Sequence, residues 1–494
     1  MGTTNRSLER LRGAAALLGI FSSAQAIPIW RLLPFPLVAA LIGYGVALFT
    51  PTVLHDPDTY WHIAAGEWIL EHRSVPHVDP FSFTMAGQPW IAHEWLSEAL
   101  MALAYRAGGW NGVVVLFSVA TATTVGCLAR YLAHHMRLFA AAVTLTAGAM
   151  CIISGMLARP HMLAMPVLVI WIIGMLSAQE RRAPPPLRLL PMMLIWANMH
   201  ASFIFGLALI APIAIDAFID AKHDAPHVAR SWTLFFAAAL ATALLTPHGW
   251  HGLLYPFQLI NMKVIASISE WRPLDLHVLH PIEPALAGLL YVVVARRVRM
   301  SVPRLLIIAV LLYLAFRHSR HEILAGIVGT AVLAEPLGRA FGGTQEASTA
   351  RRRPGYDMAI VLACATLLTV LRFAIPIVRG NGPVSPVTAL AALPAGLLKA
   401  PGFNNYDFGG YLIFRHVRPF VDGRADMYGD PFMSAYLNAV RPDRDAFERL
   451  VVKYQIRWAL LATKSAAARM VETLPGWRRI HADEVAVVFV RDGP

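Results

Sequence analysis

The stretch HDPDTYWHIAAGEWILEHRSVPHVDPFSFTMAGQPWIAHEWL, from His55 to Leu96, decides how the rest of the chain is interpreted. It directly follows the first strongly apolar segment, residues 32–51, and it carries three Asp, three Glu, five His and four Trp. Carboxylates and imidazoles are the side chains that most often transfer protons or bind metal ions. At the edge of a membrane segment, such a density indicates an active-site loop. A solvated connector with an aromatic belt is the alternative.

The composition places this loop in a membrane protein. Of the 494 residues, 57% are hydrophobic and 15% are charged, and the mean hydropathy is +0.53. A soluble domain could not bury so much apolar surface, so a lipid bilayer is the expected surrounding. All three cysteines fall in apolar segments, which argues against a disulfide framework. The net charge of +12 comes from basic residues in short loops between apolar runs, so it indicates orientation in a membrane and no nucleic-acid partner.

The apolar runs predict a mainly α, polytopic transmembrane bundle of about 11 spans within residues 1–377. Its first outer loop is 52–110, and several later runs are shorter than the ~20 residues that a perpendicular helix needs. Met1–Pro28 is basic, then apolar, and ends in Ala24-Gln25-Ala26. We interpret it as an uncleaved N-terminal helix, with a cleaved signal peptide as the alternative. The expected spans are 32–51, 111–129, 138–157, 162–178, 187–199, 201–219, 231–246, 282–295, 304–316, 322–338 and 357–377.

The charge of the loops predicts which side each one faces. Lys and Arg are concentrated in alternate loops, which the positive-inside rule assigns to the cytoplasm together with the N-terminus. The acidic first loop and everything after about residue 378 are then extracytoplasmic. The inner loops hold Arg130 and Arg137; Arg181, Arg182 and Arg188; Lys222 and Arg230; Arg296, Arg297, Arg299 and Arg304; and Arg339, Arg351, Arg352 and Arg353.

With this topology, unusual polar residues gather on the outer side. Ionisable groups near a bilayer are costly and usually line a cavity or pair with one another, so the pattern predicts a polar cleft at the outer leaflet. The alternative is that Arg and His extend from helix ends to the interface. Asn198 and His200 lie at the cleft wall, or form a hydrogen-bonding pair between helices. The residues expected to line the cleft are His62, His93, Glu94, Arg159, His161, Asn198, His200, His248, Trp271, Arg424, Asp426 and Tyr428.

A cationic cluster at a helix end indicates an anion site. The sequence Arg317-His318-Ser319-Arg320-His321-Glu322 places arginines and histidines close together at the outer side of the membrane. Guanidinium groups match the oxygens of a phosphate or diphosphate. We therefore expect Arg317, Arg320 and His321, with Arg272, to bind such a group.

Residues 378–494 change character and predict a small extracytoplasmic α/β domain after a proline-rich linker. The pattern indicates strands at 411–414, 420–421, 458–462 and 485–490 and helices at 431–440, 444–454 and 465–473. Two segments dense in Asp and Gly, 404–410 and 421–430, line the mouth of the cleft or are tight turns.

Motifs of the first loop resemble those of a known superfamily. Asp-Pro-Asp-Thr-Tyr-Trp-His-Ile-Ala at 56–64, continued by Trp-Ile-Leu-Glu-His at 68–72, is similar to the first outer loop of the C-type (GT-C) glycosyltransferases. This superfamily includes oligosaccharyltransferases, protein O-mannosyltransferases and bacterial lipopolysaccharide-modifying enzymes. The later segments at 158–161, 198–200, 247–250 and 404–430 resemble a bacterial branch grouped with it.

The resemblance implies a function and roles for particular residues. The expected reaction moves a hexosyl or pentosyl group from a polyprenyl-phosphate donor to an envelope acceptor, a lipid, glycan or protein, at the outer face of the bacterial cytoplasmic membrane. Asp56 and Asp58 match the acidic residues that act as base or bind metal in the superfamily. A divalent cation, Mg or Mn, would have Asp56, Asp58, His93 and Glu94 as candidate ligands. Oligosaccharyltransferase-like members carry a second acidic motif, and this chain has Arg159-Pro160-His161 there, which makes a metal-free or His-assisted site an alternative.

Two other classes of function stay open at the level of sequence. A transporter would also place charged groups in a cleft, although such proteins usually contain internal repeats, and none is seen here. A non-catalytic partner in envelope assembly would use the C-terminal domain for binding and would tolerate the loss of Asp56.

Overall fold

The computed structural model describes residues 33–343 and 354–492. The expected N-terminal helix within residues 1–28 lies outside the described residues. Each apolar segment expected from the sequence coincides with a helix. These helices are α3 (Phe35–Phe49), α5 (Trp95–His135), α6 (Leu138–Ile153), α7 (Pro160–Glu180), α8 (Leu190–Met199), α9 (Phe203–Ala221), α10 (Ala225–Ala243), α12 (Ile282–Ala295), α13 (Val302–Arg317), α14 (Glu322–Leu324) continued through a π-helical turn into α15 (Thr330–Ala340), and α16 (Pro354–Ala374).

Five helical segments of the described chain are long and apolar enough to cross a membrane. The helices α3, α6, α8 and α12 are apolar but shorter. The chain is therefore a multi-pass membrane protein, and the total of about 11 spans stays a prediction. The five long segments are Trp95–His135, Pro160–Glu180, Phe203–Ala221, Ser319–Ala340 and Gly355–Ala374.

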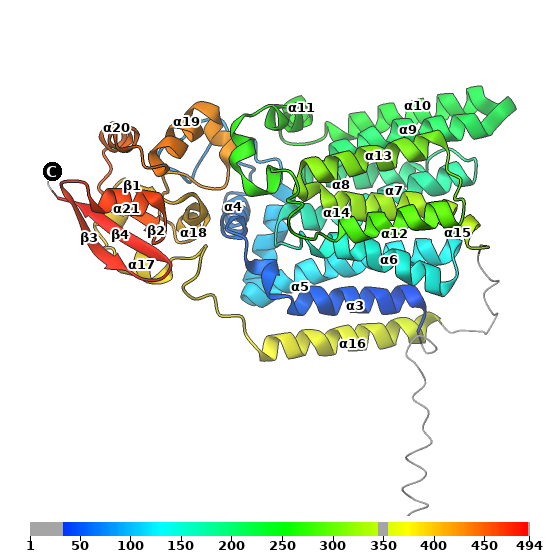
Figure 1. Cartoon of the computed structure of the whole chain (residues 1–494), viewed down its shortest axis with the longest axis horizontal. Helices are drawn as coiled ribbons and strands as arrows, with labels where there is room; N and C mark the ends of the chain where they lie inside the picture. Colours follow the sequence, from blue (N-terminus) through cyan, green and yellow to red (C-terminus); the bar gives the residue numbers. More distant parts are fainter. Residues whose placement is uncertain (1–32, 344–353, 493–494) are drawn as a thin grey trace, which may run out of the picture.

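The long helices lie side by side with roughly parallel axes, and the C-terminal unit lies beyond one end of them (Figure 1). Between the bundle and this unit lies α4 (Asp58–His72), which is formed by the first outer loop. Helix α5 begins in this same loop and is interrupted at Gly108 and Gly109. Gly109 has φ +57°, a left-handed conformation that glycine adopts without steric cost. The glycine pair thus separates an outer helix from the span that the sequence predicts at 111–129.

The predicted position of Arg304 in an inner loop is wrong. Arg304 lies within α13, where it is buried. Its guanidinium donates to Gln179 of α7 at 3.0 Å and to the carbonyl of Val332 of α15 at 3.1 Å, and pairs with Asp216 of α9 at 3.4 Å. A buried cation requires such partners, because an unpaired one would pay a large desolvation penalty. Arg304 therefore joins α13 to α7, α9 and α15.

The C-terminal unit contains a four-stranded sheet in the order β1-β2-β4-β3. Strands β1 and β2 are parallel, and the other two pairs are antiparallel. Phe403, Phe447 and Trp458 are buried in its core. The helices and strands are β1 (Gly402–Asn404), α18 (Gly409–Phe414), α19 (Ala425–Val440), α20 (Arg444–Tyr454), β2 (Trp458–Ala462), α21 (Ala466–Glu472), β3 (Trp477–Ala482) and β4 (Ala486–Arg491), preceded by the short α17 (Val387–Ala391).

Two of the strands predicted for this unit are wrong. Residues 411–414 belong to α18, which packs against α4 and is buried along most of its length. A short helix that is buried on several sides shows no 3.6-residue pattern, so its sequence resembles that of a strand. Residues 420–421 form no strand; their backbone amides bind the side chain of Asn404. The expected helices and the strands at 458–462 and 485–490 are confirmed, each within a few residues except that α19 begins six residues early.

Candidate active site

The predicted catalytic residues meet at one arginine. Asp56 follows a 3-10 turn, η1 (Pro51–Leu54), and Asp58 opens α4. One carboxylate oxygen of Asp56 accepts a hydrogen bond from the backbone N–H of Asp58 at 2.7 Å, which fixes the chain where the helix begins. Arg159, immediately before α7, pairs through Nε with Asp56 at 2.5 Å and through Nη2 with Asp58 at 2.7 Å. Its Nη1 donates to Glu270, so three carboxylates surround one guanidinium.

The two aspartates differ in their access to solvent. The side chain of Asp56 is 1% exposed and that of Asp58 is 15% exposed. Burial raises the pKa of Asp58 to about 7; Arg159 acts against this rise, while the charges on Asp56 and Glu270 add to it. Burial also raises the pKa of Asp56 against the effect of Arg159. Asp58 is therefore the carboxylate that can be reached and can exchange a proton near neutral pH.

The backbone of the C-terminal unit approaches Asp58 closely. A Cβ on Gly423 would lie 1.9 Å from Oδ1 of Asp58, so a side chain does not fit at this position. His62 lies four residues after Asp58 on α4, a spacing that allows a side-chain pair on a helix. It instead hydrogen-bonds Glu98 at 3.2 Å.

Two of the four predicted phosphate-binding residues lie beside the Arg159 group. Arg320 pairs with Glu270 at 3.5 Å, and its guanidinium lies 4.5 Å from the ring centroid of Trp271. The ring of His321 lies 6.4 Å from Trp271. Burial raises the pKa of Glu270, but the charges of Arg159 and Arg320 outweigh this effect and lower that pKa to about 2. The other two predicted residues, Arg272 and Arg317, are exposed.

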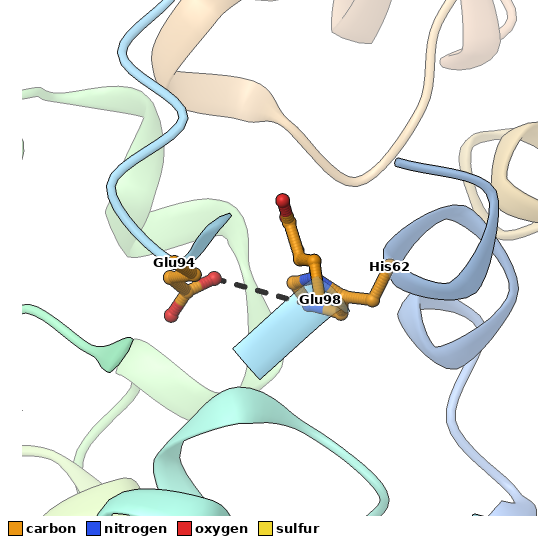
Figure 2. Close-up of side chains that lie close together, drawn as sticks. All are labelled: His62, Glu94 and Glu98. Carbon is orange, nitrogen blue, oxygen red and sulfur yellow. Dashed lines mark hydrogen bonds and ion pairs between the residues drawn. The ribbon is translucent and has the colours of Figure 1, made fainter. Parts of the chain in front are cut away.

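A second group of ionisable side chains surrounds Glu94. In Figure 2 the imidazole of His62 on α4 faces the carboxylate of Glu94, and single ligand atoms of His62, Glu94 and Glu98 on α5 lie within 4.8 Å of one another. His62 Nε2 lies 3.9 Å from Glu94, and the Nε2 atoms of His93 and His200 lie 3.6 and 3.4 Å from it. Three imidazoles from separate parts of the chain thus face one carboxylate.

The charge states of His62 and Glu94 suit the binding of a metal ion. Burial lowers the pKa of His62 to about 3, so its imidazole is neutral at physiological pH. Burial raises the pKa of Glu94, but His93 and then His200 and His62 outweigh it and hold that pKa below its usual value. Neutral imidazole and ionised carboxylate are the forms that bind a cation. Within the described residues, Oε2 of Glu98 is buried and has no hydrogen-bond partner, as a ligand atom held ready for an ion would be.

The expected metal ligands Asp56, Asp58, His93 and Glu94 do not form one site. Asp56 and Asp58 belong to the Arg159 group, where the guanidinium supplies the positive charge that a metal would otherwise supply. Only Glu94 belongs to the group with metal-ligand spacing in the described part of the chain, and His93 lies at its edge.

Several predicted cleft residues have other roles. Asn198 is satisfied as a link between helices: it accepts from Trp95 and donates to the carbonyls of Leu194 and Leu245. His161 lies near the Glu94 group, with its ring 6.0 Å from that of His200. His248 instead contacts His77, at 4.9 Å between rings. Of the two interpretations of Asn198, the structure therefore favours the hydrogen-bonding one.

Arg424 and Tyr428 do not line a cleft. Arg424 is buried, pairs with Asp79 and Asp422 at 2.7 Å each, and lies between the rings of Phe81 and Trp90. Tyr428 donates to Asp422 at 2.7 Å. Their polar atoms are directed into the protein, because a buried cation and its carboxylates must satisfy one another. The third predicted residue, Asp426, does lie near the Glu94 group: it hydrogen-bonds Tyr255 and raises the pKa of His93.

The sequence analysis assigned no role to Glu98 or Glu270. Glu98 lies four residues after Glu94, a spacing that places both on one face of a helix if the helix begins early enough. Glu270 directly precedes Trp271 and Arg272 in an outer loop. The sequence around each glutamate does not predict its role, because its partner is distant in sequence: Glu98 contacts His62, and Glu270 contacts Arg159.

Known structures resemble this fold. Archaeal oligosaccharyltransferase AglB from Archaeoglobus fulgidus, in complex with an inhibitory peptide and a dolichol-phosphate, matches with a TM-score of 0.53 and 12% identity over 87% of this chain and 69% of AglB. The apo form of the same organism's oligosaccharyltransferase matches with a TM-score of 0.53 and 12% identity, over 95% of this chain and 75% of that one. ArnT from Cupriavidus metallidurans, bound to undecaprenyl phosphate, matches with a TM-score of 0.51 and 13% identity over 94% of this chain and 98% of ArnT.

These proteins are GT-C glycosyltransferases. The chain therefore has the GT-C fold that its first outer loop suggests. No protein-family model and no curated protein matches the sequence.

Proposed function

We propose that this protein is a membrane glycosyltransferase that moves a sugar from a polyprenyl-phosphate donor to an envelope acceptor. The reaction takes place at the outer face of the bacterial cytoplasmic membrane. Residues 1–377 form the membrane domain with a cytoplasmic N-terminus, and 378–494 form an extracytoplasmic domain. AglB and ArnT were each solved with a polyprenyl phosphate, which supports the choice of donor.

One observation carries the proposal. A partly accessible carboxylate, Asp58, has its pKa raised to about 7 and lies 2.7 Å from Arg159, in a network that reaches Arg320 through Glu270. A general base works best when its pKa is near the working pH. The same network holds cations that a leaving phosphate needs. Arg159 and Glu270 thus join the proton acceptor, Asp58, to the anion site at Arg320.

The chemistry follows from these positions. Asp58 takes the proton of the acceptor hydroxyl or amide as the acceptor atom forms a bond to the anomeric carbon. The bond from that carbon to the phosphate oxygen breaks, and the polyprenyl phosphate leaves with the electron pair. Arg320, supported by the ring of Trp271, compensates the charge on the leaving phosphate. Arg159 holds Asp56 and Asp58 in place, and its positive charge offsets the repulsion between their carboxylates.

A divalent cation fits the Glu94 group. His62, Glu94 and Glu98 would hold it, with His93 and His200 close by. Mixed imidazole and carboxylate ligands suit Mn²⁺ or Zn²⁺ better than Mg²⁺, which prefers oxygen ligands and water. When bound, such an ion would neutralise negative charge on the donor or orient it.

The donor site is tested by direct binding. Arg320→Gln removes the guanidinium next to Trp271 and should weaken binding of undecaprenyl phosphate to the purified protein by about tenfold or more, since a charge-assisted contact is lost. Arg441→Gln, at an exposed position of the C-terminal unit, is the matched control and should bind as the wild type does. Native mass spectrometry in detergent measures both. Equal binding by the Arg320 variant would remove this residue from the donor site.

A further inference from the structure

A cavity of about 350 Å³ lies beside the chain that precedes Asp56, and none of its lining residues belongs to the two ionisable groups described above. It is formed by the end of α3, the turn η1, α5 and the segment that follows α16. In Figure 1, α3 and α16 run next to each other along one side of the bundle. Leu48, Phe49, Val114 and Ile377 give the cavity apolar walls.

Two arginines line this apolar cavity, and no carboxylate is among its lining residues in the described chain. The guanidinium of Arg372 lies 5.7 Å from the ring centroid of Phe49, and its Nη2 donates to the carbonyl of Ile375. Its Nε is buried and has no hydrogen-bond partner within the described residues. A buried donor without a partner is costly, so an acceptor is expected there.

The second arginine connects the cavity to the first outer loop. Arg379 donates through Nη1 to the carbonyl of Leu54 at 2.6 Å and through Nε to the hydroxyl of Tyr60 at 3.0 Å. It also lies 5.2 and 5.3 Å from the ring centroids of Tyr60 and Trp110. Leu54 ends η1 and Tyr60 lies in the first turn of α4, so Arg379 holds both sides of the segment that contains Asp56 and Asp58.

The surroundings of the cavity are those of a membrane interface. Helix α16 is apolar and long enough to span a bilayer, and only 6% of its most apolar window is buried in the protein. Leu367, Val370 and Leu371 on this helix are exposed and follow one another toward the cavity. Acyl chains can pack on such a surface, and a headgroup then lies level with Arg372 at the end of the helix.

We propose that this cavity binds an anionic phospholipid, with its phosphate between Arg372 and Arg379 and its acyl chains along α16. The phosphate supplies the acceptor that Nε of Arg372 lacks among the described residues, and it balances two cations whose cavity has no carboxylate in that part of the chain. This site is separate from the donor site at Arg320. Because Arg379 also holds η1 and α4, a bound lipid stabilises the position of the segment that carries Asp56 and Asp58.

The experiment measures which lipids stay bound. The full chain is reconstituted with equal amounts of phosphatidylglycerol and phosphatidylcholine, and native mass spectrometry gives the ratio retained. We expect the wild type to prefer phosphatidylglycerol and the variant Arg372→Gln/Arg379→Gln to lose this preference by about tenfold. The control Arg418→Gln/Arg441→Gln removes the same charge from exposed positions and should keep the wild-type ratio.

Three outcomes would overturn the proposal. In the first, the double variant retains phosphatidylglycerol as the wild type does. In the second, the wild type shows no preference, a result that does not depend on folding of the variant. In the third, inorganic phosphate at millimolar concentration displaces the lipid completely, which identifies a site for free phosphate. Retention of phosphatidylglycerol in the presence of inorganic phosphate supports the lipid site.

Discussion

Two arginines, Arg424 and Arg159, connect the first outer loop to other parts of the chain, and they differ in how completely they are enclosed. Arg424 pairs with Asp79 and Asp422, and its side chain is 1% exposed. Asp79 also accepts from Phe81 and Ser82. Nearly every polar atom in this group has a partner, so the group stabilises the contact between the loop and the C-terminal unit.

The Arg159 group has more negative than positive charge and is partly open. Three carboxylates face Arg159, whose side chain is 17% exposed, and Arg320 balances only one of them at a longer distance. The excess of negative charge, together with burial, raises the pKa of Asp58. The same residue types therefore stabilise the fold where they are enclosed and hydrogen-bonded, and can take part in chemistry where solvent or substrate reaches them.

The largest effect is expected from removing the cation of the fully buried Arg424 group. Arg424→Met should leave Asp79 and Asp422 buried without a cation, which typically costs about 3–5 kcal/mol. We expect little folded protein in the membrane fraction and rapid proteolysis of what is inserted. Arg415→Met, an exposed position of the same unit, should be harmless in the same limited-proteolysis assay. A stable Arg424 variant would show that this group is not structural.

A smaller effect is expected on the metal content of the protein when a ligand of the Glu94 group is removed. His62→Ala removes one metal ligand and should lower the Zn²⁺ or Mn²⁺ content of the purified protein by at least about tenfold, as loss of site residues commonly does. His72→Ala, at the exposed end of the same helix, serves as control. Elemental analysis after dialysis against each metal gives the content. If the wild type retains neither ion, the group is a hydrogen-bonded cluster and not a metal centre.

The smallest effect is expected for the pH dependence of the transfer rate. The folded pKa of Asp58 is raised to about 7 from the ordinary value of 3.8, so folding favours its protonated form, and its contribution to stability is lost as the pH rises through 7. Its activity as a base has the opposite dependence, because only the carboxylate accepts a proton. The transfer rate should rise about tenfold from pH 6 to pH 8. An equal rise in the residual rate of Asp58→Asn would assign the titration to another group.

The positions of the helices follow from the sequence, while the partners within the site do not. Hydrophobic runs of the right length define a helix locally, and α20 and β2 are predicted to the residue for the same reason. The first outer loop indicated Asp56 and Asp58 because it is dense in ionisable residues. The pairing of Arg424 with Asp79 joins positions 345 residues apart, and no local pattern reports such a contact.

The choice between the two aspartates shows the same limit. From the sequence, Asp56 is the preferred base because it lies nearest the membrane, and it is expected to be unnecessary for packing. In the structure, Asp56 is buried, pairs with Arg159 and fixes the start of α4. We therefore assign the base to Asp58 and a positioning role to Asp56. The surroundings of Asp58 include Gly423 of the C-terminal unit, and the sequence of the first loop by itself does not reveal this close approach.

The most direct test of the account is the envelope glycan of a strain that lacks this protein. Mass spectrometry should show a glycan missing from that strain and restored by the wild-type chain. Asp58→Asn keeps the shape of the side chain and removes its basicity, so at matched membrane levels transfer should fall by about a hundredfold or more. Asp56→Asn/Asp58→Asn should restore nothing. Full restoration by this double variant would contradict a catalytic role for the Arg159 group and would favour a non-catalytic role in envelope assembly.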